Sequence, residues 1–240
     1  GDCKRFICQQ LSRIGSAAQA PVLASLLSDE DLATDAQAAL TVIPGKDTLA
    51  AMRQMLGASK PAVTGSLITI LAQRRDVDSV EAIGKHIGAK NPNAETAIDA
   101  LGKIGGTKAV AILIKSDGKL SDDLQFTLNA ALLECAYELA DAGKTAEAAK
   151  IYVLLLTPDR PKHVRRAAFP GVVAAQKAKA APLIISTIAG KDKVLRSAAI
   201  GCLRDFKSKE ITVAVAAELG SLPPAQQRQL IGVLADRQDT

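Results

Sequence analysis

The sequence predicts an all-α fold, a right-handed α-α superhelix of about seven to eight helix pairs. An apolar pair spaced i, i+3 recurs along the 240 residues, and its first members lie 28 to 37 residues apart. Aromatic residues make up only 2% of the chain, which suits a core of closely packed small aliphatic side chains. The apolar pattern never changes to the period of two that is typical of strands. The recurring pairs are Leu11/Ile14, Leu40/Ile43, Ile68/Leu71, Leu101/Ile104, Leu132/Cys135, Phe169/Val172, Ile200/Leu203 and Ile231/Leu234.

Turn and capping residues divide this pattern into helices. Ser16 is suited to cap a first helix at 17–27, and Pro44-Gly45 is suited to end its partner at 32–43. Residues 4–14 resemble the second helix of a pair whose first helix is missing, so we expect residues 1–240 to be a single solenoid domain from a longer protein. The later pairs are expected at 48–56 and 61–74, 77–87 and 93–104, 107–115 and 121–140, 145–156 and 162–175, 181–188 and 194–206, and 209–219 and 224–235. The helix at 107–115 is expected to fall short, before Asp117 to Leu120.

Four leucine and isoleucine positions of this register are predicted to lie in a continuous core: Leu40, Leu101, Leu132 and Ile200. Cys135 and Cys202 fall on the same apolar stripe, where a free cysteine acts as a small apolar residue. Cys3 and Cys8 lie on different faces of one helix, which disfavours a disulfide between them. No C-x-x-C motif occurs, so the cysteines do not predict a zinc site.

Several short motifs resemble HEAT repeats, which belong to the armadillo-type α-solenoids. APVLASLL at 20–27 with the acidic turn at 29–31 is similar to the first helix of that repeat and the turn that follows it. VRRAA at 164–168 and VLRSAA at 194–199 are similar to its second helix, and LGKIGG at 101–106 to its helix ending. The resemblance implies a superhelix whose concave face, lined by second helices, holds a protein or peptide.

A narrower resemblance concerns the HEAT regions of large exported bacterial proteins. It is carried by RFICQQL at 5–11, QRRD at 73–76 and PKHVR at 161–165. It implies an accessory interaction domain in the cell envelope, and a cytoplasmic domain is the alternative. The sequence has neither a charged-then-apolar leader nor an apolar run of about 18 residues, so no membrane span is predicted.

Positive charge is concentrated in one part of the chain. Residues 144–209 contain 14 basic and 4 acidic residues, a net charge of +10, whereas residues 1–143 have a net charge of −3. Two basic clusters about one repeat apart are predicted to lie side by side as one basic strip, which consists of Lys162, His163, Arg165, Arg166, Lys191, Lys193 and Arg196. This strip would bind an acidic protein, a polyanion or nucleic acid. The alternative is that Asp159 pairs with Arg165 and Asp192 with Arg196, as salt bridges between neighbouring repeats.

The sequence offers no set of residues for catalysis. It contains no Gly-x-Ser-x-Gly elbow and no P-loop pattern. His86 and His163 are far apart in the sequence, so no metal site and no cofactor are predicted. With no tryptophan and few other aromatic residues, the basic region also lacks the stacking platforms of single-strand nucleic-acid binders, so nucleic acid is a disfavoured partner. The predicted function is a non-catalytic protein-interaction scaffold, and an anion-binding module is the alternative.

Overall fold

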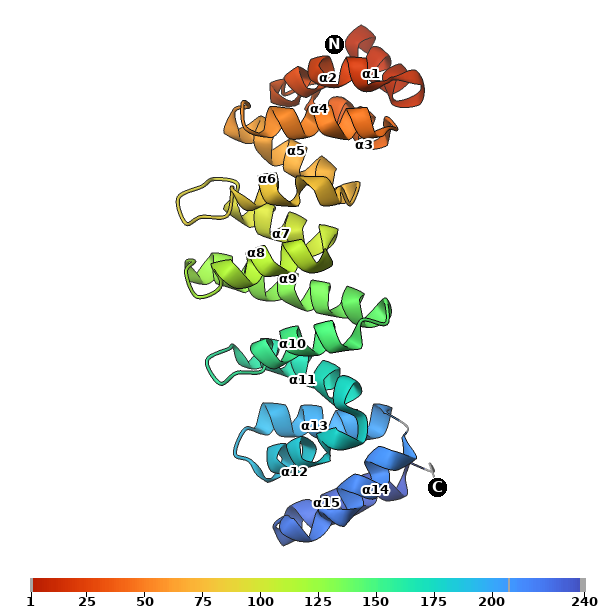
Figure 1. Cartoon of the computed structure of the whole chain (residues 1–240), viewed down its shortest axis with the longest axis vertical. Helices are drawn as coiled ribbons and strands as arrows, with labels where there is room; N and C mark the ends of the chain where they lie inside the picture. The colour runs from red at the N-terminus through yellow and green to blue at the C-terminus, as the bar shows by residue number, and fades with distance from the viewer. Residues whose placement is uncertain (1, 207, 238–240) are drawn as a thin grey trace. The chain divides into compact units, whose positions relative to one another are not determined.

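The computed structural model describes residues 2–206 and 208–237. Within these ranges all regular secondary structure is helical (Figure 1), which confirms the predicted all-α fold of stacked helix pairs. Helix α1 is followed by seven pairs, α2/α3 to α14/α15, in the described part of the chain. The chain divides into two compact units, 1–135 and 136–240, and the boundary falls within α9.

The first unit contains α1 to α8 and most of α9. The bounds are α1 (Asp2–Ile14), α2 (Ala20–Ser25), α3 (Ala33–Val42), α4 (Lys46–Leu56), α5 (Pro61–Gln73), α6 (Val80–Gly84), α7 (Ala94–Ile104), α8 (Gly106–Ser116) and α9 (Asp122–Asp141), with short 3-10 helices at Ala17–Gln19, Leu26–Ser28 and Val77–Ser79. Helix α8 is longer than expected, because its last turn continues to Ser116. The first helices α2 and α6 are shorter than expected, because 3-10 turns take up part of each predicted helix.

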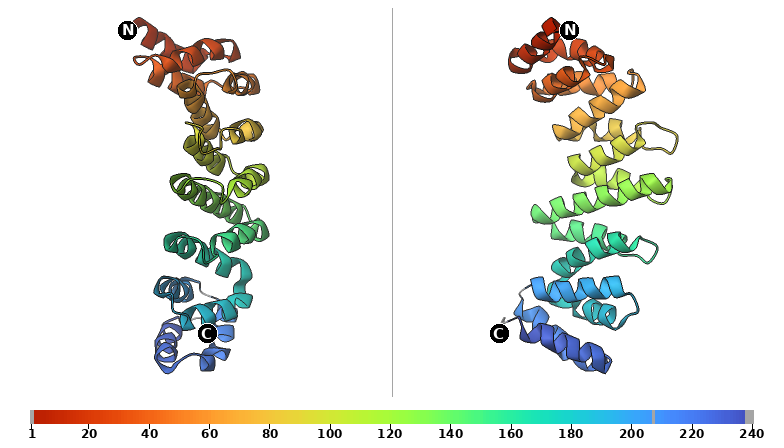
Figure 2. Two further views of the ribbon diagram at one scale, coloured as in Figure 1. Left: turned by 90° about the vertical axis from the view of Figure 1, so that its left-hand side faces the viewer. Right: turned by 180° about the vertical axis from the view of Figure 1, so that it is seen from behind.

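The second unit contains the end of α9 and all later helices. The bounds are α10 (Thr145–Leu155), α11 (Lys162–Gln176), α12 (Ala181–Ala189), α13 (Lys193–Asp205), α14 (Lys209–Ala217) and α15 (Pro224–Ala235), with 3-10 helices η4 (Lys177–Ala180) and η5 (Leu219–Ser221). Helices that follow one another in the chain pack together, as α10 does with α11 and α12 with α13, and Figure 2 shows this stacking from two further sides.

The four predicted core residues are all buried. Leu40, Leu101 and Leu132 have no exposed surface, and Ile200 is 7% exposed. Burial also holds for both members of the six inner apolar pairs, from Leu40/Ile43 to Ile200/Leu203. The repeat register that the sequence predicted is therefore confirmed for these six pairs.

The register is wrong at the two outermost pairs. Ile14 is 80% exposed and Ile231 is 52% exposed. In α15 the buried residues are Leu230 and Val233, so this helix is turned by one residue relative to the prediction. A helix that packs against a neighbour on one side only has a narrower buried stripe, and apolar spacing alone does not fix where that stripe lies.

Arginines at the ends of two second helices bind the carbonyl groups that end the preceding second helix. The Arg74 Nη1 atom donates to the Leu40 carbonyl oxygen at 3.3 Å in the first unit. The buried Arg237 guanidinium donates to the carbonyl oxygens of Leu203 and Phe206 in the second unit. In both units the arginine follows the carbonyl of its leucine by 34 residues. A positive charge at a helix C-terminus also interacts favourably with the helix dipole.

Candidate functional site

The structure brings the two predicted basic clusters next to each other in the second unit. Lys162, His163, Arg165 and Arg166 occupy the beginning of α11, whereas Lys191, Lys193 and Arg196 surround the beginning of α13. Helices α11 and α13 pack side by side. The side chains of Lys162, His163, Arg166, Lys191 and Lys193 are exposed.

The two remaining arginines of the basic strip are partly buried and form contacts between and within repeats. The Arg165 Nη1 atom lies 3.1 Å from Asp192 Oδ2, an ion pair that joins α11 to the start of α13. Arg196 donates to the carbonyl oxygen of Gly190, the C-cap residue of α12. A salt bridge between repeats therefore exists, but its partners are not those predicted.

The pairing differs from the prediction because Asp192 is the N-cap of α13. Its Oδ1 atom accepts hydrogen bonds from the backbone N–H groups of Val194 at 2.9 Å and Leu195 at 3.2 Å, which leaves Oδ2 directed at Arg165. The Leu195 N–H, the Val194 N–H and the nearby cations together hold the pKa of Asp192 below its usual range. Asp159, the other expected partner, is instead bonded to the Thr157 hydroxyl, which lowers the pKa of Asp159.

A cavity of about 340 Å³ in the second unit was not predicted from the sequence. We call it the aromatic cavity, and it lies where α9, α11 and α13 end and α10 begins. Its lining consists of three aromatic rings and of small residues: Tyr137, Ala140, Thr145, Ala148, Tyr152, Pro170, Gly171, Ala174, Ala175 and Phe206. The chain has only two tyrosines, four phenylalanines and no tryptophan, so half of its aromatic residues line this one cavity.

The two tyrosines form an edge-to-face pair, with ring centroids 5.8 Å apart and planes at 66°. Tyr152 is buried, and burial raises the pKa of its phenol to about 12, so the side chain is neutral at pH 7. Tyr137 is 53% exposed, and its hydroxyl donates to the Ala167 carbonyl oxygen on α11 at 3.4 Å. The pair thus offers one fixed ring at the base of the cavity and one accessible ring at its edge.

Gly171, which follows Pro170 in the middle of α11, makes room for the Tyr152 ring. A Cβ atom at Gly171 would lie 2.3 Å from Cε2 of Tyr152, closer than real side chains approach, so this ring position requires glycine. Pro170 has no N–H group and so cannot complete the helical hydrogen bond to the Arg166 carbonyl. A Pro-Gly pair inside a predicted helix was the one sequence signal that could have marked this place.

A second cavity of about 600 Å³ adjoins the aromatic cavity and shares Ala174 and Phe206 with it. Its other lining residues are more polar: Lys177, Ala178, Asp205, Ser208, Glu210 and Ile211. Ser208 donates to Glu210 Oε2 at 2.6 Å, and this hydrogen bond, with Lys177 nearby, lowers the pKa of Glu210. The two cavities are therefore neighbours, and the charged side chains lie in the second one.

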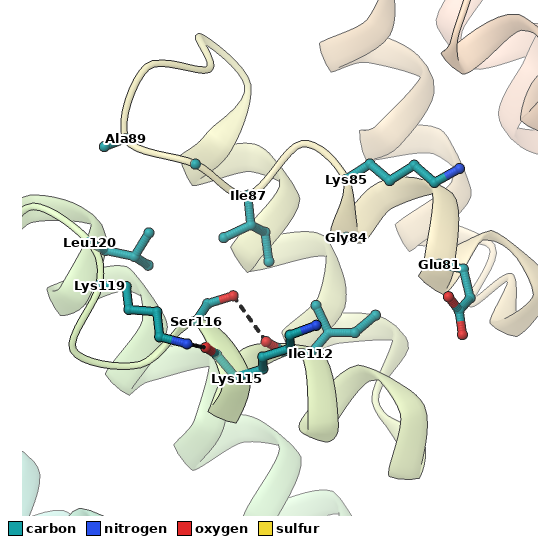
Figure 3. Close-up of a pocket in the computed structure, with 11 residues that line it drawn as sticks. Glu81, Gly84, Lys85, Ile87, Ala89, Ile112, Lys115, Ser116, Lys119 and Leu120 are labelled. Carbon is teal, nitrogen blue, oxygen red and sulfur yellow. Dashed lines mark hydrogen bonds between the residues drawn. The ribbon is translucent and has the colours of Figure 1, made fainter.

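The first unit has a cavity of about 440 Å³ between α6, α8 and the loops that follow them (Figure 3). Its polar groups bond to their own helix end: Lys119 Nζ donates to the Lys115 carbonyl at 2.7 Å, and the Ser116 hydroxyl donates to the Ile112 carbonyl at 3.0 Å. The Lys85 side chain points away from the loop that carries Ala89. Because the Ser116 hydroxyl and the Lys119 ammonium group already bond to backbone carbonyls, this cavity is a poorer candidate for a binding site than the aromatic cavity.

Among the described residues, no group of three or more His, Cys, Asp or Glu side chains could hold a metal ion. Among the residues that the structure describes, one helical stretch, residues 162–189, is long and apolar enough to cross a membrane by length and composition alone. The structure divides this stretch into α11, η4 and α12, and Lys177 at the junction has a left-handed backbone with φ of 52°. Buried residues such as Phe169 and Ile184 place it in the core of the second unit.

Comparisons with known proteins do not assign the chain to a family. Neither the scan against protein families nor the search of curated proteins found a match. The chain is similar to a chain of a solved complex in which Kap95p binding induces the switch loops of RanGDP to adopt the GTP-bound conformation. The identity is 14% and the TM-score is 0.44, over 92% of this chain and 30% of that chain. A likeness of this size carries no information about function.

Proposed function

We propose that the chain is a non-catalytic scaffold of HEAT type that binds a protein or peptide segment on the surface formed by its second helices. The aromatic cavity is the observation that carries this proposal. Binding energy at protein interfaces is concentrated in a few pockets that take up a large side chain, and aromatic residues are enriched there. In a chain with so few aromatic residues, three rings around one opening provide such a pocket.

The size and lining of the aromatic cavity fit a side chain better than a reaction centre. A volume of about 340 Å³ lies at the lower end of the range of small-molecule pockets. Its lining contains no histidine, cysteine or carboxylate, and its hydroxyl groups come from Thr145 and the two tyrosines. Neutral Tyr152, packed against Gly171, cannot act as a base at neutral pH.

A random peptide library displayed on phage tests the proposal directly. We expect the protein to enrich peptides that share one large apolar residue. Ala140→Trp should fill the opening of the cavity and weaken the selected peptides by about tenfold or more, since Ala140 is exposed and lines the cavity. Ala146→Trp is the matched control, because Ala146 is an exposed alanine of α10 outside the lining. Equal binding of the peptides to both variants would refute the proposal.

The second candidate function is an anion-binding module that uses residues 144–209. It is favoured by the net charge of +10 in this region and by the exposed side chains of Lys162, Arg166 and Lys193. Such a module would lose affinity steeply as salt rises, because each phosphate contact releases a counterion. Isothermal titration with polyglutamate and with polyphosphate at two salt concentrations measures this slope. Binding of either polymer that does not change with salt would exclude this candidate.

A further inference from the structure

We propose that the aromatic cavity and the exposed residues of the basic strip form one composite site for an extended acidic peptide. In this site one apolar side chain of the peptide enters the cavity, and a carboxylate about two to four residues away pairs with Arg166. The inference rests on the proposed function and specifies the chemistry of its partner.

A single ridge of α11 connects the two halves of the site. Lys162, Arg166, Pro170 and Ala174 follow one another at intervals of four residues, which is the spacing of a ridge along a helix surface. Pro170 and Ala174 line the aromatic cavity, whereas Lys162 and Arg166 are exposed near the helix start. A residue bound at the ridge therefore has the cavity on one side and two cations on the other.

The helix geometry sets the distance between the two contacts. At about 1.5 Å per residue, Arg166 lies roughly 6 Å from Pro170 and 12 Å from Ala174 along the axis of α11. An extended peptide advances about 3.3 Å per residue, so this distance corresponds to about two to four residues. The partner should therefore contain an acidic residue at this separation from an apolar residue.

Arg166 is the arginine of the basic strip best placed for a partner. Arg165 is paired with Asp192, and Arg196 donates to Gly190, so both contribute to packing between helices. Arg166 is exposed, and its forked N–H groups can bind a carboxylate through two parallel hydrogen bonds. The second cavity, which shares Ala174 and Phe206 with the aromatic cavity, carries the carboxylates of Asp205 and Glu210 and one cation, Lys177, so it attracts an acidic residue less than the basic strip does. The charges therefore favour a peptide whose acidic residue lies over the start of α11.

A small set of fluorescein-labelled synthetic peptides tests the inference by fluorescence anisotropy. The parent peptide has two glutamates, a Gly-Ser spacer of about three residues and one tryptophan. A second peptide replaces both glutamates by glutamine, and a third replaces them by lysine. The protein variants are Arg166→Glu and, as a matched charge reversal, Lys150→Glu, because Lys150 is an exposed residue of α10 that lines neither cavity of the second unit. Circular dichroism confirms that each variant is folded.

We expect Arg166→Glu to weaken the glutamate peptide by about tenfold or more at low salt and to leave the glutamine peptide within about twofold. The same variant should bind the lysine peptide more tightly than the wild-type protein does. Lys150→Glu should change the affinity for the glutamate peptide by less than about threefold. Ala140→Trp should weaken all the peptides that bind the wild-type protein, because all of them carry the tryptophan.

Four results would overturn the inference. The first is an equal effect of Arg166→Glu and Lys150→Glu, which would indicate only a general attraction of charge. The second is no detectable binding of the glutamate peptide up to about 1 mM. The third is tight binding of polyphosphate that Arg166→Glu weakens and Ala140→Trp does not, which would assign the strip to a polyanion. The fourth is equal affinity of the wild-type protein for the glutamate and the glutamine peptides, which would leave the proposed function standing and refute this inference.

Discussion

Two glycines in second helices show how differently the two units use the absence of a side chain. In the first unit, a Cβ atom at Gly102 of α7 would lie 2.9 Å from the Ala131 Cβ atom of α9, so glycine lets the two helices pack closely. In the second unit, a Cβ atom at Gly171 of α11 would meet the ring of Tyr152 on α10. There the glycine makes room for an aromatic ring, and a cavity remains beside it. Glycine thus allows close packing of two helices in the first unit, whereas in the second unit it accommodates a ring beside a cavity.

This difference shows where function is expected in a repeat protein. The close contact between Gly102 and Ala131 contributes to helix packing and leaves no space there for a partner's side chain. Beside Gly171 the Tyr152 ring is buried, and its edge-to-face partner Tyr137 is 53% exposed, so the pair links the core to the surface. This is why the proposed binding site lies beside Gly171 and not beside Gly102.

The largest expected effect concerns the close packing beside Gly102. Leu101→Ala should reduce the free energy of unfolding by about 2–5 kcal/mol, because Leu101 is fully buried beside Gly102 and its truncation leaves a cavity. Ile14→Ala, at an 80% exposed position, should change it by less than about 0.5 kcal/mol. Urea denaturation of both variants measures the difference. A Leu101→Ala midpoint equal to that of the wild type would show that the first unit is not tightly packed at this point.

An intermediate effect is expected at Gly171, beside the aromatic cavity. Gly171→Ala should destabilise the protein by about 1–3 kcal/mol, because overpacking against the Tyr152 ring outweighs the gain in helix propensity. Gly201→Ala should instead stabilise it by about 0.5–1 kcal/mol, since Gly201 lies within α13 and a Cβ atom there meets nothing within 4 Å. Thermal denaturation of the pair provides the comparison. Changes of the same sign would contradict the role assigned to Gly171.

A smaller and pH-dependent effect is expected at Asp192. Asn is as good an N-cap residue as Asp, so Asp192→Asn mainly removes the charge that faces Arg165. Because the pKa of Asp192 is lowered in the folded state, its charge stabilises the fold above the unfolded pKa of about 3.9, and this stabilisation is lost as pH falls through the lower folded value. The variant should thus be less stable than the wild type at pH 7 and equally stable near pH 2. Urea unfolding at both pH values tests this, and a difference independent of pH would contradict it.

The last prediction involves no change in stability. Cys3 is exposed, whereas Cys8, Cys135 and Cys202 are buried, and burial raises the pKa of Cys202 to about 12. Because the thiolate is the reactive form, a disulfide reagent at pH 8 should modify Cys3 quickly and the other three only after unfolding. Counting the thiols released before and after addition of guanidinium checks this. Fast reaction of Cys202 in the native protein would show that the core of the second unit opens readily.

The fold was predictable from the sequence because each repeat carries an apolar pair at a regular spacing along the chain. Inner pairs such as Leu101/Ile104 are buried on both sides by neighbouring helices, so their pattern is complete in the sequence. Helix α15 has a narrower buried stripe, and there the predicted register was wrong by one residue. The helix bounds were predicted closely at several proline positions, such as Pro61 and Pro224, whereas α6 ends at Gly84, three residues before the expected end.

The candidate site was less predictable because its contacts join residues that are distant in the chain. The basic residues lie around the starts of α11 and α13, as the expected helix bounds required, and their role in binding stays a prediction. The sequence paired two of the arginines with the wrong carboxylates, since Arg165 reaches Asp192 across 27 residues. The aromatic cavity combines Tyr137, Tyr152 and Phe206 from three repeats. Nothing in their spacing shows that Gly171 leaves room for the Tyr152 ring.

The distribution of tyrosines has a practical consequence for spectroscopy. The chain contains no tryptophan and two tyrosines, and both tyrosines line the aromatic cavity. Nearly all of its ultraviolet emission after excitation near 280 nm must therefore arise beside this opening. The protein carries its own optical reporter there, and quenching or a lifetime change on titration would register occupancy without any label.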